Sequence, residues 1–355
     1  MSGARIDMPG AGSGTTVLRA GGLSVRLPRR ALVAGAGCAL VALIAALFAI
    51  GSGDYPMTPG AVLRTLGGGG SVAETFIVRE IRLPRAVTAL LTGAALGLSG
   101  AVFQSLSRNP LGSPDVLGFT HGASTGALLV IIVAGAGSVA VAAGAAVGGI
   151  ATGALIYVLA GRHGLHGYRL VLVGIGMWAV LSGVNGYLLT RTEITDAARA
   201  VLWLTGSLAG RGWNDAWPLL AAILVAAPVV LIAGPAMRTV ELGDDAAHAL
   251  GVRVHRLRTA LLAAAVLLSS FAAAAAGPVA FVALTAPQLA RRLTRTPGPN
   301  LLPAACMGAA LMVVADLAGQ RAVPGHQLPV GVLTGVLGGT YLIWLLITER
   351  KRNRV

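Results

Sequence analysis

Charged residues are scarce in this chain. Only 11% of its 355 residues are Asp, Glu, Lys or Arg, while 55% are hydrophobic, and soluble domains carry about 25% charged residues. The mean hydropathy of +0.78 points the same way. A soluble globular domain is therefore excluded, and the composition predicts a protein that crosses a membrane several times.

Lysine is nearly absent, because Lys351 is the sole lysine among the 27 basic residues. A phosphate-binding loop of the G-x-x-x-x-G-K-[ST] type needs a lysine directly after its second glycine, and the sequence contains no such loop. The HExxH motif of zinc helices is absent too. An enzyme is disfavoured, and any ATP-driven step has to be carried out by another chain.

Cysteine is rare in the chain, and its histidines are not clustered. Cys38 and Cys306 lie far apart in separate apolar runs, so they imply neither a disulfide framework nor a metal pair. The six histidines show no ligand spacing, and we expect no metal and no cofactor on this chain. The formal charge of +14 comes from arginines dispersed between apolar runs, which argues against a nucleic-acid partner.

Long apolar runs are what the sequence does contain. We expect a disordered basic cytoplasmic tail over residues 1–30, a multi-pass transmembrane domain over 31–348 and a basic tail over 349–355. The predicted spans are 31–50, 86–106, 116–135, 138–160, 170–190, 213–232, 260–276, 279–289, 301–317 and 328–347. Gly144 and Gly148 predict close helix packing within the fourth span. Most basic residues then fall on one side, which places both termini in the cytoplasm.

Two halves of the chain carry a more specific pattern of residues. These are Arg82, Pro84, Arg85, Gly93, Gln104, Asn109, Pro110, Leu111, Leu117 and Gly118 in the first half, and Glu241, Leu242, Gly243, Ala247, Leu250, Gly251, Val252, Pro287, Asp316 and Arg321 in the second. With this spacing the chain resembles the FecCD-type permease subunits of iron-siderophore and cobalamin ABC importers, over roughly residues 75 to 348. It departs from them at Gln288, where the family often has a histidine.

The resemblance implies an all-α type II importer permease of about ten transmembrane helices. It implies a second permease chain, identical or related, an ATPase subunit that holds ATP and Mg²⁺, and a substrate-binding protein outside the membrane. The implied cargo is a ferric siderophore, with cobalamin or haem as alternatives. A secondary transporter or channel is the alternative class; it is disfavoured because Asp316 is the one acidic residue inside an apolar run.

The resemblance also implies roles for two groups of residues. Arg82, Arg85 and Arg321 are expected to meet glutamates of the binding protein, the alternative being that they reach for lipid headgroups. Gly167 and Tyr168, in the basic loop 162–169, are expected to close the path on the cytoplasmic side. The alternative for these two is an ordinary connecting loop.

The segment 238–258 is predicted to be the element that couples the chain to the ATPase. Leu242, Ala246 and Leu250 recur at helical spacing, which predicts a short helix with an apolar face. Asp244 comes early and Gly251 late, as helix ends prefer. In the resembled family this loop packs into a groove of the ATPase. The alternative is a positively charged loop that only fixes the topology.

Overall fold

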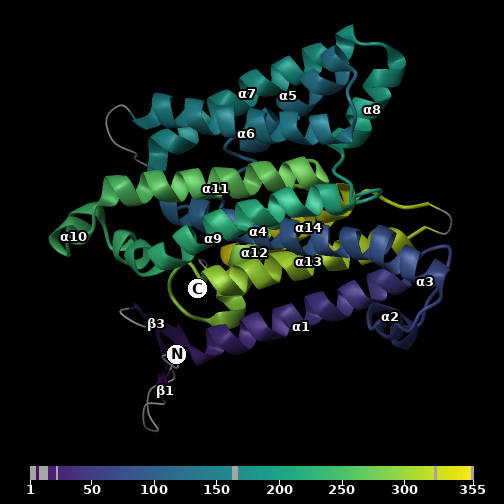
Figure 1. Ribbon diagram of the computed structural model, residues 1–355. Helices are drawn as coiled ribbons and strands as arrows, with labels where there is room; N and C mark the ends of the chain where they lie inside the picture. Colours follow the sequence, from purple (N-terminus) through teal and green to yellow (C-terminus); the bar gives the residue numbers. More distant parts are fainter. Residues whose placement is uncertain (1–4, 8–14, 21–22, 162–166, 324–325, 353–355) are drawn as a thin grey trace.

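The computed structural model describes the chain except for residues 1–4, 8–14, 21–22, 162–166, 324–325 and 353–355. Its long helices lie side by side with roughly aligned axes and form a bundle (Figure 1). Ten helices correspond in order to the ten predicted spans: α1 (Arg29–Gly51), α4 (Leu83–Ser107), α5 (Phe119–Leu129), α6 (Ser138–Gly161), α7 (Gly167–Arg191), α9 (Trp213–Glu241), α11 (Val254–Ala276), α12 (Val282–Thr294), α13 (Leu301–Arg321) and α14 (Val330–Arg352). The predicted all-α membrane fold is confirmed.

Seven of the described helices are long and apolar enough to cross a membrane. The residues of α5, with the π-helical turn η2 (Val130–Ala134), and those of α14 form shorter apolar helices. The predicted span 279–289 differs most from the structure. Gly277 and Phe281 both have positive φ, so the chain between them is not helical and α12 is a short helix that starts at Val282.

Smaller elements lie at the two ends of the bundle. At one end are α2 (Pro59–Leu66), α3 (Val72–Phe76) and α8 (Ile194–Leu204), and at the other is α10 (Asp244–Ala249) (Figure 1). The π-helical turn η1 (Ile77–Arg82) leads from α3 into α4. These are called the α2 end and the α10 end below.

Three short strands lie in the described part of residues 1–30. Strands β1 (Arg5–Asp7), β2 (Thr15–Ala20) and β3 (Leu23–Pro28) form an antiparallel sheet in the order β1-β2-β3. Leu23, Val25 and Leu27 alternate with polar residues, and this period of two is typical of a strand. The helix that follows begins at Arg29, two residues before the predicted start.

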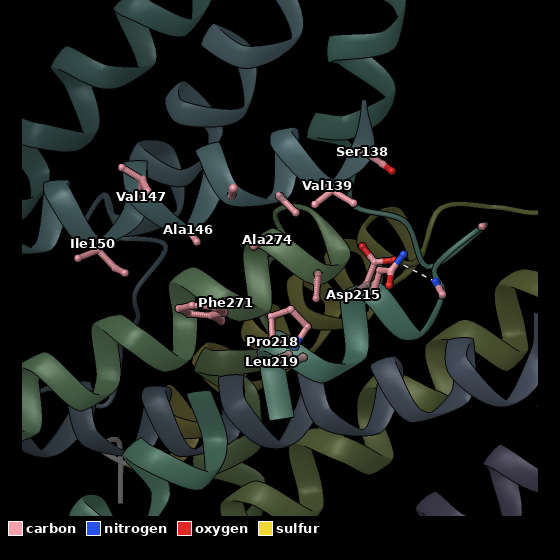
Figure 2. Close-up of a pocket in the computed structure, with 16 residues that line it drawn as sticks. Ser138, Val139, Ala146, Val147, Ile150, Asp215, Pro218, Leu219, Phe271 and Ala274 are labelled. Carbon is pink, nitrogen blue, oxygen red and sulfur yellow. Dashed lines mark hydrogen bonds between the residues drawn. The ribbon is translucent and has the colours of Figure 1, made fainter. Parts of the chain in front are cut away.

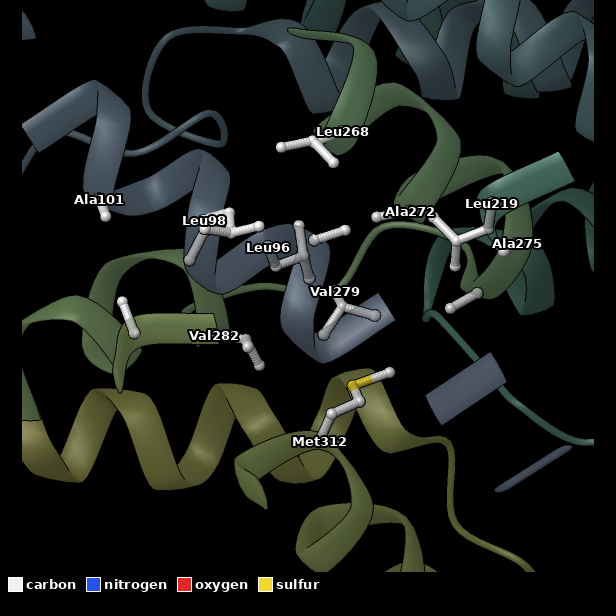
Figure 3. Close-up of a cluster of buried hydrophobic side chains, with 14 of the residues drawn as sticks. Leu96, Leu98, Ala101, Leu219, Leu268, Ala272, Ala275, Val279, Val282 and Met312 are labelled. Carbon is white, nitrogen blue, oxygen red and sulfur yellow. The ribbon is translucent and has the colours of Figure 1, made fainter. Parts of the chain in front are cut away.

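Helix α4 lies at the centre of the packing, against α13, α11, α12 and α9. Figure 3 shows part of this core, where Leu96 and Leu98 of α4 lie near Leu268 of α11 and Met312 of α13. Glycines bring the backbones close: a Cβ on Gly97 would overlap the carbonyl oxygen of Ala304. In lipid such close packing, rather than a hydrophobic drive, holds helices together.

The predicted close packing of the fourth span is confirmed. Gly144 and Gly148 of α6 lie against Gly126 and Gly122 of α5, so that a Cβ at any of these positions would meet the opposite backbone or side chain. Helices α5 and α6 are therefore held together by glycine contacts as well.

Candidate functional site

The predicted coupling segment forms the short helix α10 between α9 and α11. Gly243, just before it, and Gly251, just after it, have φ values of 125° and 80°, which glycine adopts without steric cost. Ala247 is fully buried against Val240 and Val254. The loop itself is shorter than predicted, because α9 continues to Glu241 and α11 already begins at Val254.

The apolar face predicted for this helix points away from the rest of the chain. Leu242 and Leu250 are 75% and 68% exposed, and Ala246 and Ala249 are exposed as well. Large apolar side chains left exposed beside a polar helix mark a contact surface. Within this chain α10 therefore has an anchored side and a free side.

Asp244 anchors α10 to two other helices, a contact that sequence reasoning missed. Its carboxylate accepts a fork of hydrogen bonds from Arg258 of α11, at 2.8 and 2.9 Å, and one at 2.5 Å from Arg108, the residue that ends α4. Arg108 also donates to the carbonyl of Val240 at 2.8 Å. The sequence indicated only that Asp244 and Arg258 belong to the same segment, 238–258; it gave no sign of Arg108.

The Asp244 carboxyl titrates abnormally because of these partners. Partial burial raises its pKa, but the hydrogen bonds and charge of Arg258 and the charge of Arg108 outweigh that effect and leave the pKa below its usual value. A carboxyl with a lowered pKa in the folded state stabilises that state above the unfolded pKa of about 3.9, and the contribution disappears as the pH falls through the folded value. The Asp244 carboxyl is therefore ionised at neutral pH.

Several residues of the family pattern meet near the same end of the molecule. The Gln104 side chain of α4 donates to the carbonyl of Leu284 at 2.9 Å, and Arg291 of α12 donates to the Gln104 amide oxygen. Gln288 of α12 donates to the carbonyl of Pro110 at 2.7 Å. The amide at 288 therefore acts as a hydrogen-bond donor, a role that needs no titratable imidazole.

The turn after α4 is shaped by its own side chains. The Asn109 side-chain oxygen accepts a hydrogen bond from the Leu111 N–H at 2.9 Å, a local turn that asparagine favours. Pro287 lies inside α12 and is buried. It cannot donate to the carbonyl of Ala283, and Gly100 of α4 packs directly on that carbonyl. A cavity of about 280 Å³ opens beside this turn, between Gln104, Arg108, Glu241 and Arg291.

The three arginines expected to dock a binding protein do lie together at the α2 end, around a depression of about 850 Å³. Arg82 donates to the carbonyls of Ile50 and Tyr55 at 2.9 and 2.8 Å, and so ties down the loop after α1. Arg321 is exposed and bonds only to the Ser52 hydroxyl among the hydrogen bonds of the described residues, at 2.8 and 3.0 Å.

Arg85 is occupied within the chain. It forms a fork with Asp316 of α13, at 2.9 and 3.2 Å, and donates to Gln327 at 2.7 Å. The Asp316 side chain is only 4% exposed, and its carboxylate also accepts from Gln320. The acidic residue that the sequence placed inside an apolar run is thus half of a buried ion pair.

The residues expected to form a gate lie at the start of α7. Gly167 packs against the end of α4, where a Cβ would come within 2.9 Å of the Leu106 carbonyl oxygen. Tyr168 is 78% exposed. The remainder of the predicted gate loop, residues 162–166, lies outside the described part of the chain.

An apolar pocket of about 490 Å³ lies between α6, α9 and α11 (Figure 2). Val147 and Ile150 of α6 and Phe271 of α11 point into it. Its one acidic residue, Asp215, accepts a hydrogen bond from the Gly212 N–H at 2.9 Å and pairs with Arg211 at 3.3 Å. The carboxylate caps α9 and is not a free ligand.

The described residues form neither a nucleophile elbow nor a group of metal ligands. Gly122 to Gly126 does read G-x-S-x-G, but it lies inside α5, whereas a nucleophile elbow needs a sharp turn between strand and helix. No three His, Cys, Asp or Glu side chains of the described chain are grouped to hold a metal ion.

Comparison with known proteins places the chain in a family. The model of the FecCD transport family matches residues 39–348. The ferric enterobactin transport system permease protein FepG of Escherichia coli (strain K12) is 43% identical over 93% of this chain and 100% of that protein. The Fe(3+)-citrate import system permease protein YfmE of Bacillus subtilis (strain 168) is 36% identical over 93% of this chain and 99% of that protein.

A solved structure agrees with the sequence matches. A metal-chelate type ABC transporter in an inward-facing conformation superposes with a TM-score of 0.78 at 27% identity, covering 89% of this chain and 99% of that chain. The sequence and structure matches each extend over nearly the whole length of the chain. The chain therefore belongs to the FecCD transport family, as a permease of the ABC importer type.

Proposed function

We propose that this chain is the membrane permease of an importer that moves a ferric siderophore from a substrate-binding protein into the cytoplasm. The observation that carries the proposal is the 43% identity to the ferric enterobactin permease over 93% of the chain. Iron(3+) chelates also stand in the names of YfmE and of the hydroxamate permease FhuG of Bacillus subtilis, 34% identical over 87% of the chain. Cobalamin and haem are the alternative cargoes.

Uptake by cells that lack the gene tests the cargo. Deletion should abolish uptake of radiolabelled iron supplied as ferric enterobactin, and a plasmid copy should restore it. Uptake of labelled cobalamin and of haem, measured in the same strains, should not change. Intact iron uptake together with lost cobalamin or haem uptake would replace the siderophore by that cargo.

ATP and Mg²⁺ belong to a separate ATPase subunit in this proposal, because the chain has no phosphate-binding loop. We assign the contact with that subunit to α10 and its flanks, which puts the α10 end and both termini in the cytoplasm and the chain in the bacterial cytoplasmic membrane. The exposed Leu242 and Leu250 support this assignment, since an apolar face is stabilised when a partner covers it.

A single substitution tests the assignment of α10. Leu250→Asp puts a charge on the face that the ATPase would cover, so the ATPase should no longer copurify with the permease and uptake should be lost. Arg253→Gln, in the same loop, leaves the apolar face unchanged and should retain copurification. Full copurification with Leu250→Asp would remove α10 from this role.

The opposite end is then the outer one and meets the substrate-binding protein. Among the three arginines, Arg321 suits this role best, because it is exposed and its only described partner is a serine hydroxyl. Arg82 and Arg85 support the outer loops and α13 through the bonds given above. Loss of Arg85 would therefore affect the fold as well as any docking.

A second permease chain completes the path in this proposal, with α7 at the contact between the two chains. Only 17% of the most apolar stretch of α7 is buried, less than in the other six long apolar helices. Gly167 and Tyr168 lie at the cytoplasmic end of the same helix, which suits a gate at the end of the path. The gate would close when the two copies of α7 approach each other there.

A further inference from the structure

We propose that Asp244 is a positioning residue that transmits movement of α10 to α4 and α11. The inference rests on the proposed function, in which α10 contacts the ATPase. Its basis is that one carboxylate is shared between Arg258 of α11 and Arg108 at the end of α4. The cluster of these three residues is called the Asp244 clamp.

The clamp and a small apolar cluster hold α10 against the helices on either side of it. A helix of six residues is too short to be stable in isolation. It is held by Ala247, buried against Val240 and Val254, and by the Asp244 carboxylate. The apolar contact at Ala247 does little to stop α10 from sliding over its neighbours. The hydrogen bonds of Asp244 have a fixed direction, and charged hydrogen bonds are roughly twice as strong as neutral ones. A push on α10 is therefore transmitted mainly through Asp244.

The two arms of the clamp differ in burial. The Arg258 side chain is only 9% exposed and forms a bidentate fork, and breaking such a buried pair is costly. Arg108 is 44% exposed, so its side chain can exchange its contact with Asp244 for water. We infer that α10 moves together with α11 as one unit, and that Arg108 is the switchable arm toward α4.

Hydrogen bonds also join the end of α4, next to Arg108, to α12. The turn after α4 is fastened by the hydrogen bond from Gln288 to Pro110, and the last turns of α4 by the bond from Gln104 to Leu284. Because α4 is tightly packed along its length, a displacement at its end shifts the turn and α12 rather than bending the helix. The clamp thus connects the ATPase-facing helix to α11 and, through α4, to α12.

Two readouts on the assembled complex test the clamp. The complex with its ATPase is reconstituted in liposomes, and iron uptake from ferric enterobactin is measured per ATP hydrolysed. Separately, Leu111→Cys, in the turn after α4 and 46% exposed, is labelled with a maleimide with and without ATP, with Cys38 and Cys306 replaced by alanine. The second readout needs no transported substrate, so it stays valid if the cargo is another chelate.

Asp244→Asn should retain copurification of the ATPase and ATP hydrolysis, while uptake per ATP falls by about tenfold, within the usual range for coupling between sites. The ATP-dependent change in labelling at position 111 should disappear. Arg108→Ala should give the same two losses without threatening the fold, because its side chain is partly exposed. Asp244→Glu should restore most of the coupling. Arg30→Gln removes a charge at the exposed start of α1, outside α10 and its flanks, and is the control that should behave as wild type.

The inference is overturned if Asp244→Asn and Arg108→Ala both keep wild-type uptake per ATP and wild-type labelling changes. It is also overturned if Asp244→Asn detaches the ATPase, because Asp244 would then be a docking or folding residue. Failure of the proposed function looks different: Leu250→Asp would leave the ATPase attached, whatever the Asp244 variants do.

Discussion

Some arginines at the α2 end stabilise the fold, whereas others are exposed and could bind a partner. Measurements of the unfolding temperature distinguish the two kinds. Arg85→Ala leaves the nearly buried carboxylate of Asp316 without its fork, and breaking a buried pair in this way costs about 3–5 kcal/mol. We expect a clear drop in the unfolding temperature of the purified protein. Arg64→Ala, which removes an exposed pair with Glu74 at 4.0 Å, should change it little.

Arg321→Glu should keep the unfolding temperature and reduce uptake, because Arg321 is exposed and bonds only to a hydroxyl in the described chain. Equal unfolding temperatures for Arg85→Ala and Arg64→Ala would mean that the ion pair adds nothing to stability. Unchanged uptake with Arg321→Glu would favour a role toward lipid headgroups instead.

The sequence located individual functional residues but did not predict which side chains they contact. Asp316 was identified as the acidic residue within an apolar run, but its partner Arg85 is 231 positions away. Pairing at that distance depends on which helices pack together, and local pattern does not contain that information. Asp244 is a similar case, because its two arginines belong to different helices.

At the level of helices, the contact between α4 and α13 depends on the absence of side chains. Gly97→Ala would drive its Cβ into the Ala304 carbonyl oxygen, and neither backbone can move without separating the helices. We expect a lower yield of monodisperse protein and a lower unfolding temperature. Gly37→Ala, on α1, has open space around the new Cβ and should be neutral or stabilising by up to about 1 kcal/mol, the difference in helix propensity. Equal behaviour of the two variants would contradict the close contact.

Long apolar helices could be predicted from the sequence, whereas breaks between helices within an apolar region could not. Hydrophobic length located the ten spans, and helical spacing located α10, because both signals are local. The short α12 was predicted with the wrong start, since the positive φ of Phe281 is unusual for a large residue and is imposed by its surroundings.

For the whole molecule, the composition of exposed faces indicates where a second chain would lie. The exposed side of α1 consists largely of Leu, Val, Ile and Phe, for example Leu40 and Leu43, which suits contact with lipid. The exposed side of α7 carries large apolar residues too, such as Leu172 and Val180. It adds Gly176, Ala179 and Gly183 at helical spacing, with open space around the two glycines. Small residues allow two helices to approach closely in a membrane, so α7 is the better candidate for the interface.

Cysteine crosslinking in membranes tests this arrangement. In a chain with Cys38 and Cys306 replaced by alanine, Ala179→Cys should give a covalent dimer, because the same position on two copies of α7 would meet across a two-fold axis. Leu43→Cys on α1 is the matched control and should stay monomeric, since its side chain faces lipid. If the partner is a related permease rather than a second copy, the crosslink appears only when that chain carries a cysteine at the corresponding position. Tyr168→Cys should crosslink in one nucleotide state and not in the other if the end of α7 closes the path. Equal crosslinking at positions 43 and 179, or none at 179 with either partner, would place the interface on another helix.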